Sequence, residues 1–517
     1  MWAALLLVVA GYALLVIGAV RGRGALWHDE ATSVMGAAGH LDEWHRFEFD
    51  EVPPYRVWAT AADYQGFQSI DRPLDLQGVS RSLGDHDWSP PGFFWLLHLA
   101  LLAGIPVLWA GPVVNVLLAA VGTVIAFRMV FHLTGTAPGG VLAAAAALWS
   151  PALVLAGGEA RHYPLYGVML LALASWGAGA VVEARRGGLG RGRLVGLGGI
   201  TLMGLLANHQ FLFNGIAAVL LVVVLTRPGR RTVLQIGAAF LTGAVASWLV
   251  FPYYIIHFGR LGAATAGFRV DLVAGRASRW LTGAFDVITL DRSFEDLARL
   301  TGRVLVATAV VAVAMLHRRL IGRVRREPHL AFPTLLAIAS LWIAATGYAL
   351  QRVLVFVEGG HYIAPLWPLT MVAIAVVVLS AWPRAGSAIL GVVAVVLLTS
   401  SVAWVRSIAP IGDATRGLLA TVATADAIVV DCVARGYFPT VVPALDPATP
   451  VYAARGDDLV ADLDAGFELP GERVVLLHAP CGSDADVFAA FAAAGFGELT
   501  EVGRLERLQV WWIRADG

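Results

Sequence analysis

Long apolar stretches alternate with short polar segments over the first 405 residues of the chain. A transmembrane helix needs about 20 mostly apolar residues. We expect spanning helices at eleven stretches: 2–20, 113–132, 139–156, 164–182, 194–208, 211–226, 232–256, 304–316, 330–350, 362–381 and 386–405. The first has no charged segment before it and no small-residue cleavage motif after it, which favours an uncleaved span over a signal peptide. Another apolar stretch, 91–110, begins at two prolines and contains Gly104 and Pro106, so it either spans or lies along the interface.

The pattern changes after residue 405. Short apolar runs at 428–430, 474–477 and 510–513 predict strands, and 414–424 and 484–494 predict helices. We therefore expect two domains, a transmembrane domain at 1–405 and a small soluble α/β domain at 406–517. Cys432 and Cys481 each follow a predicted strand. A disulfide between them and a pair of buried free thiols are both open.

Composition supports a polytopic membrane protein. The chain is 58% hydrophobic and 14% charged, which excludes an ordinary soluble domain. Its formal net charge is zero, so nothing in the totals favours a nucleic-acid partner. Every basic residue is arginine, and with the heavy use of alanine this is typical of a GC-rich genome such as an actinobacterial one.

Arginine placement predicts the orientation. Arginines cluster in the short loops 183–193, 227–231 and 317–329, which are separated by pairs of predicted spans and therefore share a side, expected to be cytoplasmic. Loop 257–303 mixes seven arginines with acids and is expected outside. Everything after residue 405 then falls on the extracytoplasmic side. If 91–110 is interfacial, Asp29 faces outside; if it spans, Asp29 faces the cytoplasm.

Polar islands interrupt the apolar pattern at the ends of predicted spans. They are 27–31 (WHDEA), 85–95 (DHDWSPPGFFW), 158–164 (GEARHYP), 359–365 (GGHYIAP) and, more weakly, 208–210 (NHQ). Carboxylates at a membrane edge are costly to desolvate, so they favour a function over packing. If 91–110 is interfacial, all the islands lie on one external face. Their acids could accept a proton, and Arg161 with the histidines could hold an anion.

The islands resemble motifs of the C-type glycosyltransferases that use lipid-linked sugars, in particular bacterial relatives of protein O-mannosyltransferases and lipid A aminoarabinose transferases. The resemblance rests on Asp29-Glu30-Ala31, Ser89-Pro90-Pro91, 159–163 and His361-Tyr362 with Pro365, in the family's order. It implies about eleven transmembrane helices, a first external loop at 21–112 with juxtamembrane helices that include 91–110, and an external loop at 257–303 over the site. The resemblance also implies a plasma-membrane enzyme with an extracytoplasmic site.

The chemistry implied by the resemblance is inverting transfer of a monosaccharide from a polyprenyl phosphate donor to a hydroxyl of a glycan, glycolipid or protein. Asp29 would be the general base, Glu30 would orient it or the acceptor, and Arg161 would bind the leaving phosphate. Further candidates for the donor are Glu159, His162, Tyr163, His209, His361 and Tyr362, with His28, Asp87 and Ser89 as supporting residues of the first loop. Relatives often have arginine where this chain has His361.

Several alternatives remain open at this stage. Asp29 and Glu30 could simply begin a helix, and Arg161 could be an interfacial anchor. A divalent metal ion could bridge Asp29 or Asp87 to phosphate, although no ligand spacing requires it. A transporter or flippase of lipid-linked sugar is the alternative function, and a scaffold with a glycan-binding C-terminal domain is a third. A GC-rich genome would favour mannose or arabinose as the sugar.

Overall fold

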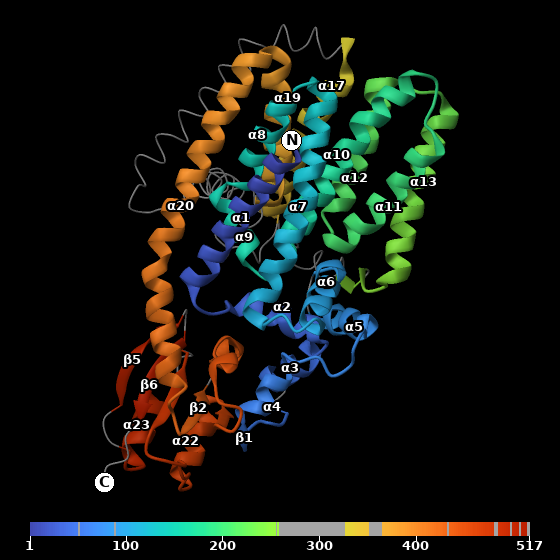
Figure 1. The fold of residues 1–517 in the computed structure, drawn as a ribbon. Helices are drawn as coiled ribbons and strands as arrows, with labels where there is room; N and C mark the ends of the chain where they lie inside the picture. The colour runs from blue at the N-terminus through green and yellow to red at the C-terminus, as the bar shows by residue number, and fades with distance from the viewer. Residues whose placement is uncertain are drawn as a thin grey trace. The chain divides into compact units, whose positions relative to one another are not determined.

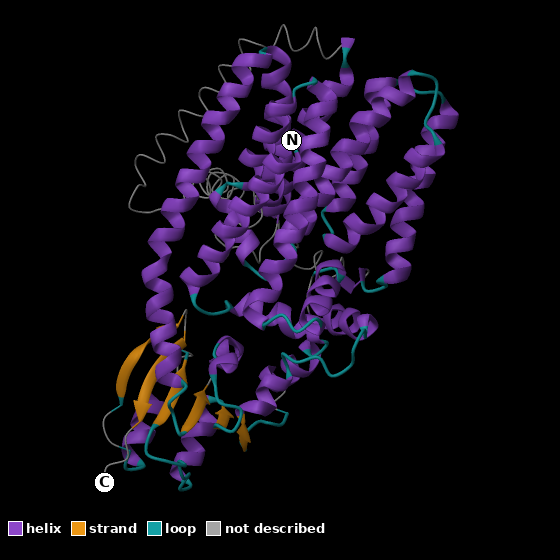
Figure 2. Cartoon of the chain, in the orientation of Figure 1, coloured by secondary structure: helices purple, strands orange, loops and turns teal. Residues whose placement is uncertain are grey.

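The structure is a computed structural model that describes residues 1–49, 52–86, 89–254, 256–257, 326–350, 364–431, 434–479, 484–496, 499–505 and 508–513. It contains two compact units, and each draws on several stretches of the chain (Figure 1). Unit 1 comprises Met1–Ala19, Trp88–Phe93 and Pro112–Ser407. Unit 2 comprises Val20–Asp87, Phe94–Gly111 and Ile408–Gly517. Helices dominate unit 1, whereas the strands belong to unit 2 (Figure 2).

Unit 1 is a bundle of apolar helices. Its elements are α1 (Trp2–Arg23), α7 (Val107–Thr134), α8 (Ala137–Leu148), α9 (Pro151–Gly158), α10 (Tyr163–Arg185), α11 (Arg191–Ala207), α12 (Phe211–Thr226), α13 (Arg230–Val250), α17 (Pro328–Leu350), η3 (Ala364–Leu366), α19 (Trp367–Ala381) and the first part of α20 (Pro383–Val422). Helices lie at ten of the eleven predicted spans, and the remaining one, 304–316, falls outside the described residues. The chain is therefore a mostly helical membrane protein, as predicted.

Two of the predicted apolar stretches are each divided between two helices. The stretch 139–156 contains α8 and α9, which are bent by 60° because Pro151 lacks the N–H that would continue the first helix. The stretch 91–110 contains α6 (Gly92–Leu102) and the start of α7. With 11 residues, α6 is about 17 Å long, too short for a hydrocarbon layer of about 30 Å. Six described helices are long and apolar enough to span, or seven if α8 and α9 form one broken span.

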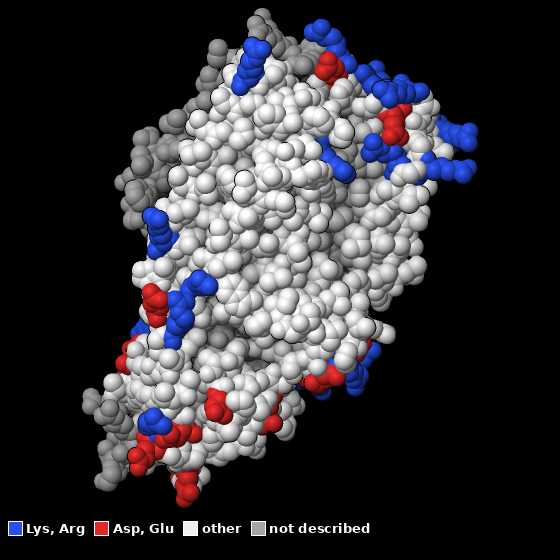
Figure 3. Space-filling model, in the orientation of Figure 1, with Lys and Arg blue, Asp and Glu red and all other residues white. Residues whose placement is uncertain are grey.

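Loops of two kinds alternate along helices α10 to α13. The loops after α10 and α12 carry the predicted arginine clusters, and Figure 3 shows basic side chains gathered over them. Arg185 donates a hydrogen bond to the carbonyl oxygen of Arg326 (3.3 Å), which brings the first and third clusters to the same end of the bundle. The loops before α10 and after α11 carry the polar islands, so the arginines and the islands occupy opposite ends of these helices.

The core of unit 2 is a six-stranded sheet in the order β1-β3-β2-β4-β6-β5. Strands β2 (Ala427–Asp431), β3 (Pro450–Ala454) and β4 (Val474–His478) are parallel, and β1 (Trp58–Thr60), β5 (Thr500–Leu505) and β6 (Leu508–Ile513) pair antiparallel with their neighbours. Helices α22 (Gly456–Asp464) and α23 (Asp484–Ala493) contribute Leu459 and Phe491 to its apolar core. The strands predicted at 428–430, 474–477 and 510–513 are confirmed.

The first polar loop is part of this sheet. Strand β1 pairs with β3 at the sheet edge, and Arg56 holds Asp458 at 3.0 Å and also pairs with Asp462. Trp58 packs on Tyr452, with ring centroids 5.4 Å apart. The other described helices of unit 2 are α2 (His28–Ala38), α3 (Leu41–Phe49), α4 (Ala61–Gly66), α5 (Leu76–His86), α21 (Ala434–Tyr437), η4 (Phe438–Thr440) and η5 (Val442–Ala444). The sequence did not predict that the loop and the C-terminal domain would form one unit.

Helix α20 is longer than predicted. The expected span 386–405 and the expected helix 414–424 belong to one helix of 40 residues, about 60 Å long. Glycines bring it against α1: a Cβ on Gly412 would lie 2.5 Å from the carbonyl group of Gly22. Apolar periodicity could not reveal this continuity, because the polar residues after 405 end the hydrophobic signal without ending the helix.

Candidate functional site

The candidate residues fall into two sets, one in each unit. Asp29, Glu30 and His28 belong to unit 2, and the islands 158–164 and 208–210 belong to unit 1. Each set is built from the end of an apolar helix and the turn that follows it.

Helix α2 presents the acidic pair in its first turn. Asp29 is exposed, whereas Glu30 is buried with 2% of its surface accessible. Successive helical residues point about 100° apart, so neighbouring acids meet different surroundings. Asp29 is therefore the solvent-accessible carboxylate of the pair, and Glu30 makes its contacts inside the protein.

Glu30 fixes the corner between α1 and α2. Its Oε2 accepts hydrogen bonds from Arg23 Nη1 at 2.5 Å and from the backbone N–H of Trp27 at 2.9 Å. Arg23 and Glu30 are both buried, so the ion pair is shielded from water. Removal of either residue would leave an uncompensated buried charge. The acid also satisfies an N–H at the start of the helix. These contacts hold the first turn of α2 in place, and the role of Glu30 in orienting Asp29 or the acceptor stays a prediction.

In unit 1, the turn before α10 is held by hydrogen bonds from Asn115. This side chain, buried within α7, donates to the carbonyl oxygen of Glu159 at 2.6 Å and lies 3.3 Å from that of Ala156. The carbonyls at the end of α9 would otherwise lack helical partners. Glu159 is itself buried, and the turn leads directly into Arg161 and His162.

His162 is a neutral ring that accepts a hydrogen bond from Asn208 and keeps its own proton on the other nitrogen. Asn208 Oδ1 accepts the N–H of Gln210 (2.8 Å), which orients the amide so that its Nδ2 donates to His162 Nε2 (3.1 Å). The proton of His162 therefore resides on Nδ1, a buried atom with no hydrogen-bond partner among the described residues. Burial, then the charges of Arg161 and His209, lower the pKa of His162 from 6.5 to about 3.

Arg161 and Tyr163 complete this turn. Arg161 is half-buried, and its guanidinium carbon lies 5.8 Å from the centroid of the Tyr163 ring. Tyr163 packs with Ala152, Ala156 and Ala364, so the start of η3 lies against the same turn. The last residues of the late island are thereby brought to the 158–164 island.

His209 lies in a small aromatic group at the end of α11. Its Nε2 is 3.0 Å from Nδ1 of His257, and its ring meets Tyr254 edge-on at 5.2 Å. The N-terminus of α6 approaches the same end of α11, since a Cβ on Gly92 would lie 2.7 Å from the carbonyl oxygen of Leu206. Ser89, buried just before α6, thus belongs to the same unit as the islands at 158–164 and 208–210.

Several predicted residues fall outside the described part of the chain. They are Asp87, His361, Tyr362, Cys432 and Cys481, together with most of loop 257–303. The proposed disulfide and the role of His361 therefore stay predictions. Among the described residues, no group of three or more His, Cys, Asp or Glu side chains is arranged to hold a metal ion.

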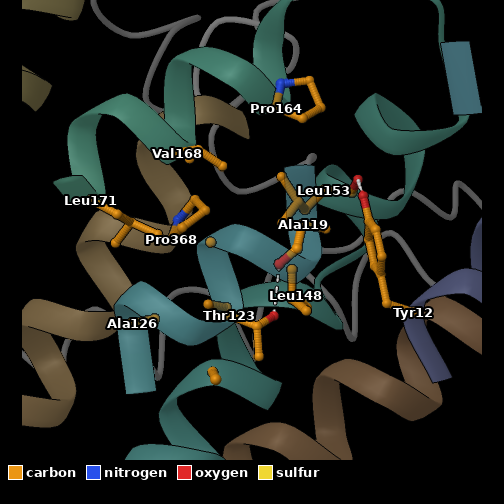
Figure 4. A pocket seen from close by; sticks show the side chains of 13 residues that line it. Tyr12, Ala119, Thr123, Ala126, Leu148, Leu153, Pro164, Val168, Leu171 and Pro368 are labelled. Atoms are coloured by element: carbon orange, nitrogen blue, oxygen red, sulfur yellow. Dashed lines mark hydrogen bonds between the residues drawn. The ribbon is translucent and has the colours of Figure 1, made fainter. Parts of the chain in front are cut away.

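An apolar cavity lies within unit 1 but differs in character from the polar turns. It measures about 20 Å³ and is lined by residues of α1, α7, α8, α9, α10 and α19 (Figure 4). Tyr12 and Thr123 border it, yet their hydroxyls donate to the carbonyls of Leu153 and Ala119. With no free polar group and little room, the cavity is a packing void rather than a sugar site.

Sequence reasoning missed three residues that shape the two sets. Asn115 lies in the middle of an apolar helix, where a polar residue is itself a signal of function or of interhelical bonding. Arg23 ends the first span and resembled an ordinary interfacial anchor. Tyr437 contacts His28 from a segment some 400 residues away in the chain, and no local pattern could have revealed that contact.

The fold defines a class. A bundle of apolar helices and a sheet that includes part of the first loop together match the fold of a solved membrane protein, ArnT. The structures of ArnT from Cupriavidus metallidurans, one bound to undecaprenyl phosphate and one in the apo state, are each 12% identical with a TM-score of 0.52. Each match covers 98% of this chain and 97% of ArnT. At this identity, the similarity establishes the fold.

A weaker match is the Archaeoglobus fulgidus oligosaccharyltransferase in complex with Zn and sulfate. It is 10% identical with a TM-score of 0.41, and the match covers 97% of this chain and 72% of that one. A score this low supports no inference about this chain. No family model matches the sequence, and no curated protein matches it.

Proposed function

We propose that the chain is an inverting glycosyltransferase that moves a monosaccharide from a polyprenyl phosphate to a hydroxyl of an extracytoplasmic acceptor. The observation that carries the proposal is the full-length similarity to ArnT, whose structure holds undecaprenyl phosphate. The acceptor class is a cell-wall glycan, a glycolipid or a protein, and the sugar is a hexose or pentose such as mannose or arabinose.

In the proposed reaction, the acceptor oxygen attacks the anomeric carbon from the face opposite the phosphate. The new C–O bond forms as the bond to the phosphate oxygen breaks, which inverts the anomeric centre. The acceptor proton passes to the Asp29 carboxylate, and polyprenyl phosphate leaves with its electron pair. The exposure of Asp29 in the first turn of α2 supports this role, because a general base must be reachable by its substrate.

Arg161 and His162 are proposed to receive the leaving phosphate. Negative charge grows on that group, and a fixed cation such as Arg161 is most effective where water is excluded. The buried Nδ1–H of His162 supplies a neutral donor next to it. A ring with a pKa near 3 adds no charge at neutral pH, so the positive charge of this turn comes from Arg161. No step is assigned to a metal ion.

The central test uses the full-length chain in nanodiscs with radiolabelled mannose, arabinose and aminoarabinose donors on undecaprenyl phosphate. An envelope extract of the organism that encodes the chain serves as acceptor. Asp29→Asn should lower transfer at least a hundredfold, because general-base catalysis contributes about 10²–10⁴. Asp42→Asn, which changes an acid in the first turn of α3, is the matched control. Normal transfer by Asp29→Asn would refute the assignment of the base.

The phosphate site has a separate readout in the binding of undecaprenyl phosphate. Arg161→Gln should weaken binding about tenfold, since a charge-assisted hydrogen bond contributes about 1.5–3 kcal/mol. Arg185→Gln, at the C-terminal end of helix α10 and away from the turn that holds Arg161, should leave binding unchanged. Equal binding by both variants would exclude Arg161 from the donor site. Movement of intact donor across the bilayer without any glycosylated product would favour a transporter.

A further inference from the structure

The C-terminal domain reaches the candidate base through one short segment. Strand β2 ends at Asp431, and the chain then forms α21 and η4, which lie against α2. The ring of Tyr437, the last residue of α21, lies 4.8 Å from the ring of His28 at an angle of 39°. His28 is the first residue of α2 and directly precedes Asp29.

Gly436 lets this segment approach closely. A Cβ at Gly436 would lie 2.5 Å from Oε1 of Glu48 and 3.9 Å from Cε1 of His28. Any larger residue would therefore displace the carboxylate of α3 that faces this point. Another titratable neighbour is His45, whose Nδ1 lies 3.7 Å from Oε2 of Glu48.

The same segment is anchored on its other side by helix α4 and the turn after it. Gln68 Nε2 donates to the carbonyl oxygen of Pro439 at 2.7 Å, and Gln65 Nε2 donates to that of Leu445 at 3.0 Å. The ring of Tyr64 packs edge-on against Phe438 at 5.1 Å. The segment 436–445 thus lies among α2, α3 and α4, and a displacement of the C-terminal sheet would be transmitted to α2.

We propose that Gly436 and Tyr437 position helix α2, and through His28 the carboxylate of Asp29, so that the C-terminal domain is part of the acceptor side of the enzyme. The inference rests on the proposed function. A general base must be held within a few tenths of an ångström of its productive position, and a helix end is only as rigid as the groups packed against it. Glu30 fixes α2 at one side of its first turn, and Tyr437 fixes it at the other.

Tyr437→Ala, Tyr437→Phe and Phe496→Ala are the informative variants, assayed in the full-length chain in nanodiscs. Phe496 packs on the apolar core of the sheet in the same domain, so it controls for general loosening of the sheet. Tyr437→Ala should lower kcat for transfer about tenfold. Tyr437→Phe keeps the ring and should stay within twofold of the parent. Binding of undecaprenyl phosphate should stay within twofold in all three.

An activity-independent readout is the coupling of glycine ethyl ester to Asp29 by carbodiimide, followed by peptide mass spectrometry across pH. Tyr437→Ala should shift the pH profile of this coupling, whereas Phe496→Ala should not. Identical profiles and identical kcat for these two variants would overturn the positioning role. If Asp29→Asn itself transfers normally, the proposed function fails instead, so the two failures are distinguishable.

Discussion

His162 shows how burial decides the chemistry of a single residue. Its neutral ring accepts a hydrogen bond from Asn208 and keeps its own proton on a buried nitrogen. The sequence identified His162 as a donor-site candidate from its place in the 158–164 island. It could not identify the tautomer, because that depends on an amide 46 residues away.

Lowering the pH should reduce the free energy of unfolding, because His162 is buried in its neutral form. Its folded pKa of about 3 lies below the ordinary value of 6.5, so between these pH values the unfolded chain binds more protons and stability falls as pH falls. The loss is about 1.4 kcal/mol per pH unit. Compared with His162→Gln, the parent should lose about 2 kcal/mol of unfolding free energy between pH 6.5 and 5.

Thermal unfolding in detergent across this pH range is the measurement. His132→Gln is the control, because His132 is exposed and its removal should leave the pH dependence unchanged. Parallel pH profiles for the parent and His162→Gln would contradict the assignment of a neutral, buried His162.

At the scale of elements, glycine spacing brings α1 and α20 together. Gly22 and Gly412 meet backbone to backbone, and Arg416 donates a hydrogen bond to the carbonyl oxygen of Arg21 beside them. Small residues that let helix backbones approach are typical of contacts between helices of membrane proteins. These two are among the 56 glycines of the sequence, so their pairing could not be predicted from their presence.

Gly412→Ala should destabilise the protein by about 1–3 kcal/mol, because the new Cβ would overlap the carbonyl group of Gly22 and force the helices apart. Gly417→Ala lies five residues further along α20, where a Cβ meets nothing within 4 Å. That change should be neutral or stabilising by up to about 1 kcal/mol, since alanine favours the helix. Melting temperatures of the two variants in the same detergent test the difference, and equal values would contradict the close helix contact.

The helices and strands that the sequence predicted correctly are those with a clear local pattern of apolar residues. Apolar runs of sufficient length located ten of the eleven predicted spans among the described helices, and β-branched runs located β2, β4 and β6. Strand β1 was not predicted, because three residues of a polar loop carry no periodic signal and are ordered by pairing with β3. Tertiary contact, rather than propensity, forms that strand.

At the scale of the molecule, the division into units does not follow the order of the chain. Residues 20–87 belong with residues 408–517, although the sequence predicted a boundary at 405. Hydrophobicity separates apolar from polar segments but cannot tell which polar segments pack on one another. Asp29 lies in unit 2 and Arg161 in unit 1, and their shared role in one reaction stays a proposal.

Removal of residues 408–517 should therefore disorder the first loop rather than only shorten the protein. Without β3, strand β1 loses its ladder, and Arg56 loses both carboxylates. Limited trypsin digestion should cut at Arg46 and Arg56 much faster in the truncated chain, and cleavage after Arg185 serves as the reference in unit 1. Unchanged cleavage in the first loop would contradict the single-unit description.

The Arg23–Glu30 pair limits how chains of this fold can diverge. Glu30 accepts from a side chain and from the N–H of Trp27 at once, so exchanging the two charges would leave that N–H facing a second donor. The pair is directional: it can be lost as a whole or kept, but not inverted. Among related sequences, positions 23 and 30 should therefore change together, and the acid should always occupy the later one.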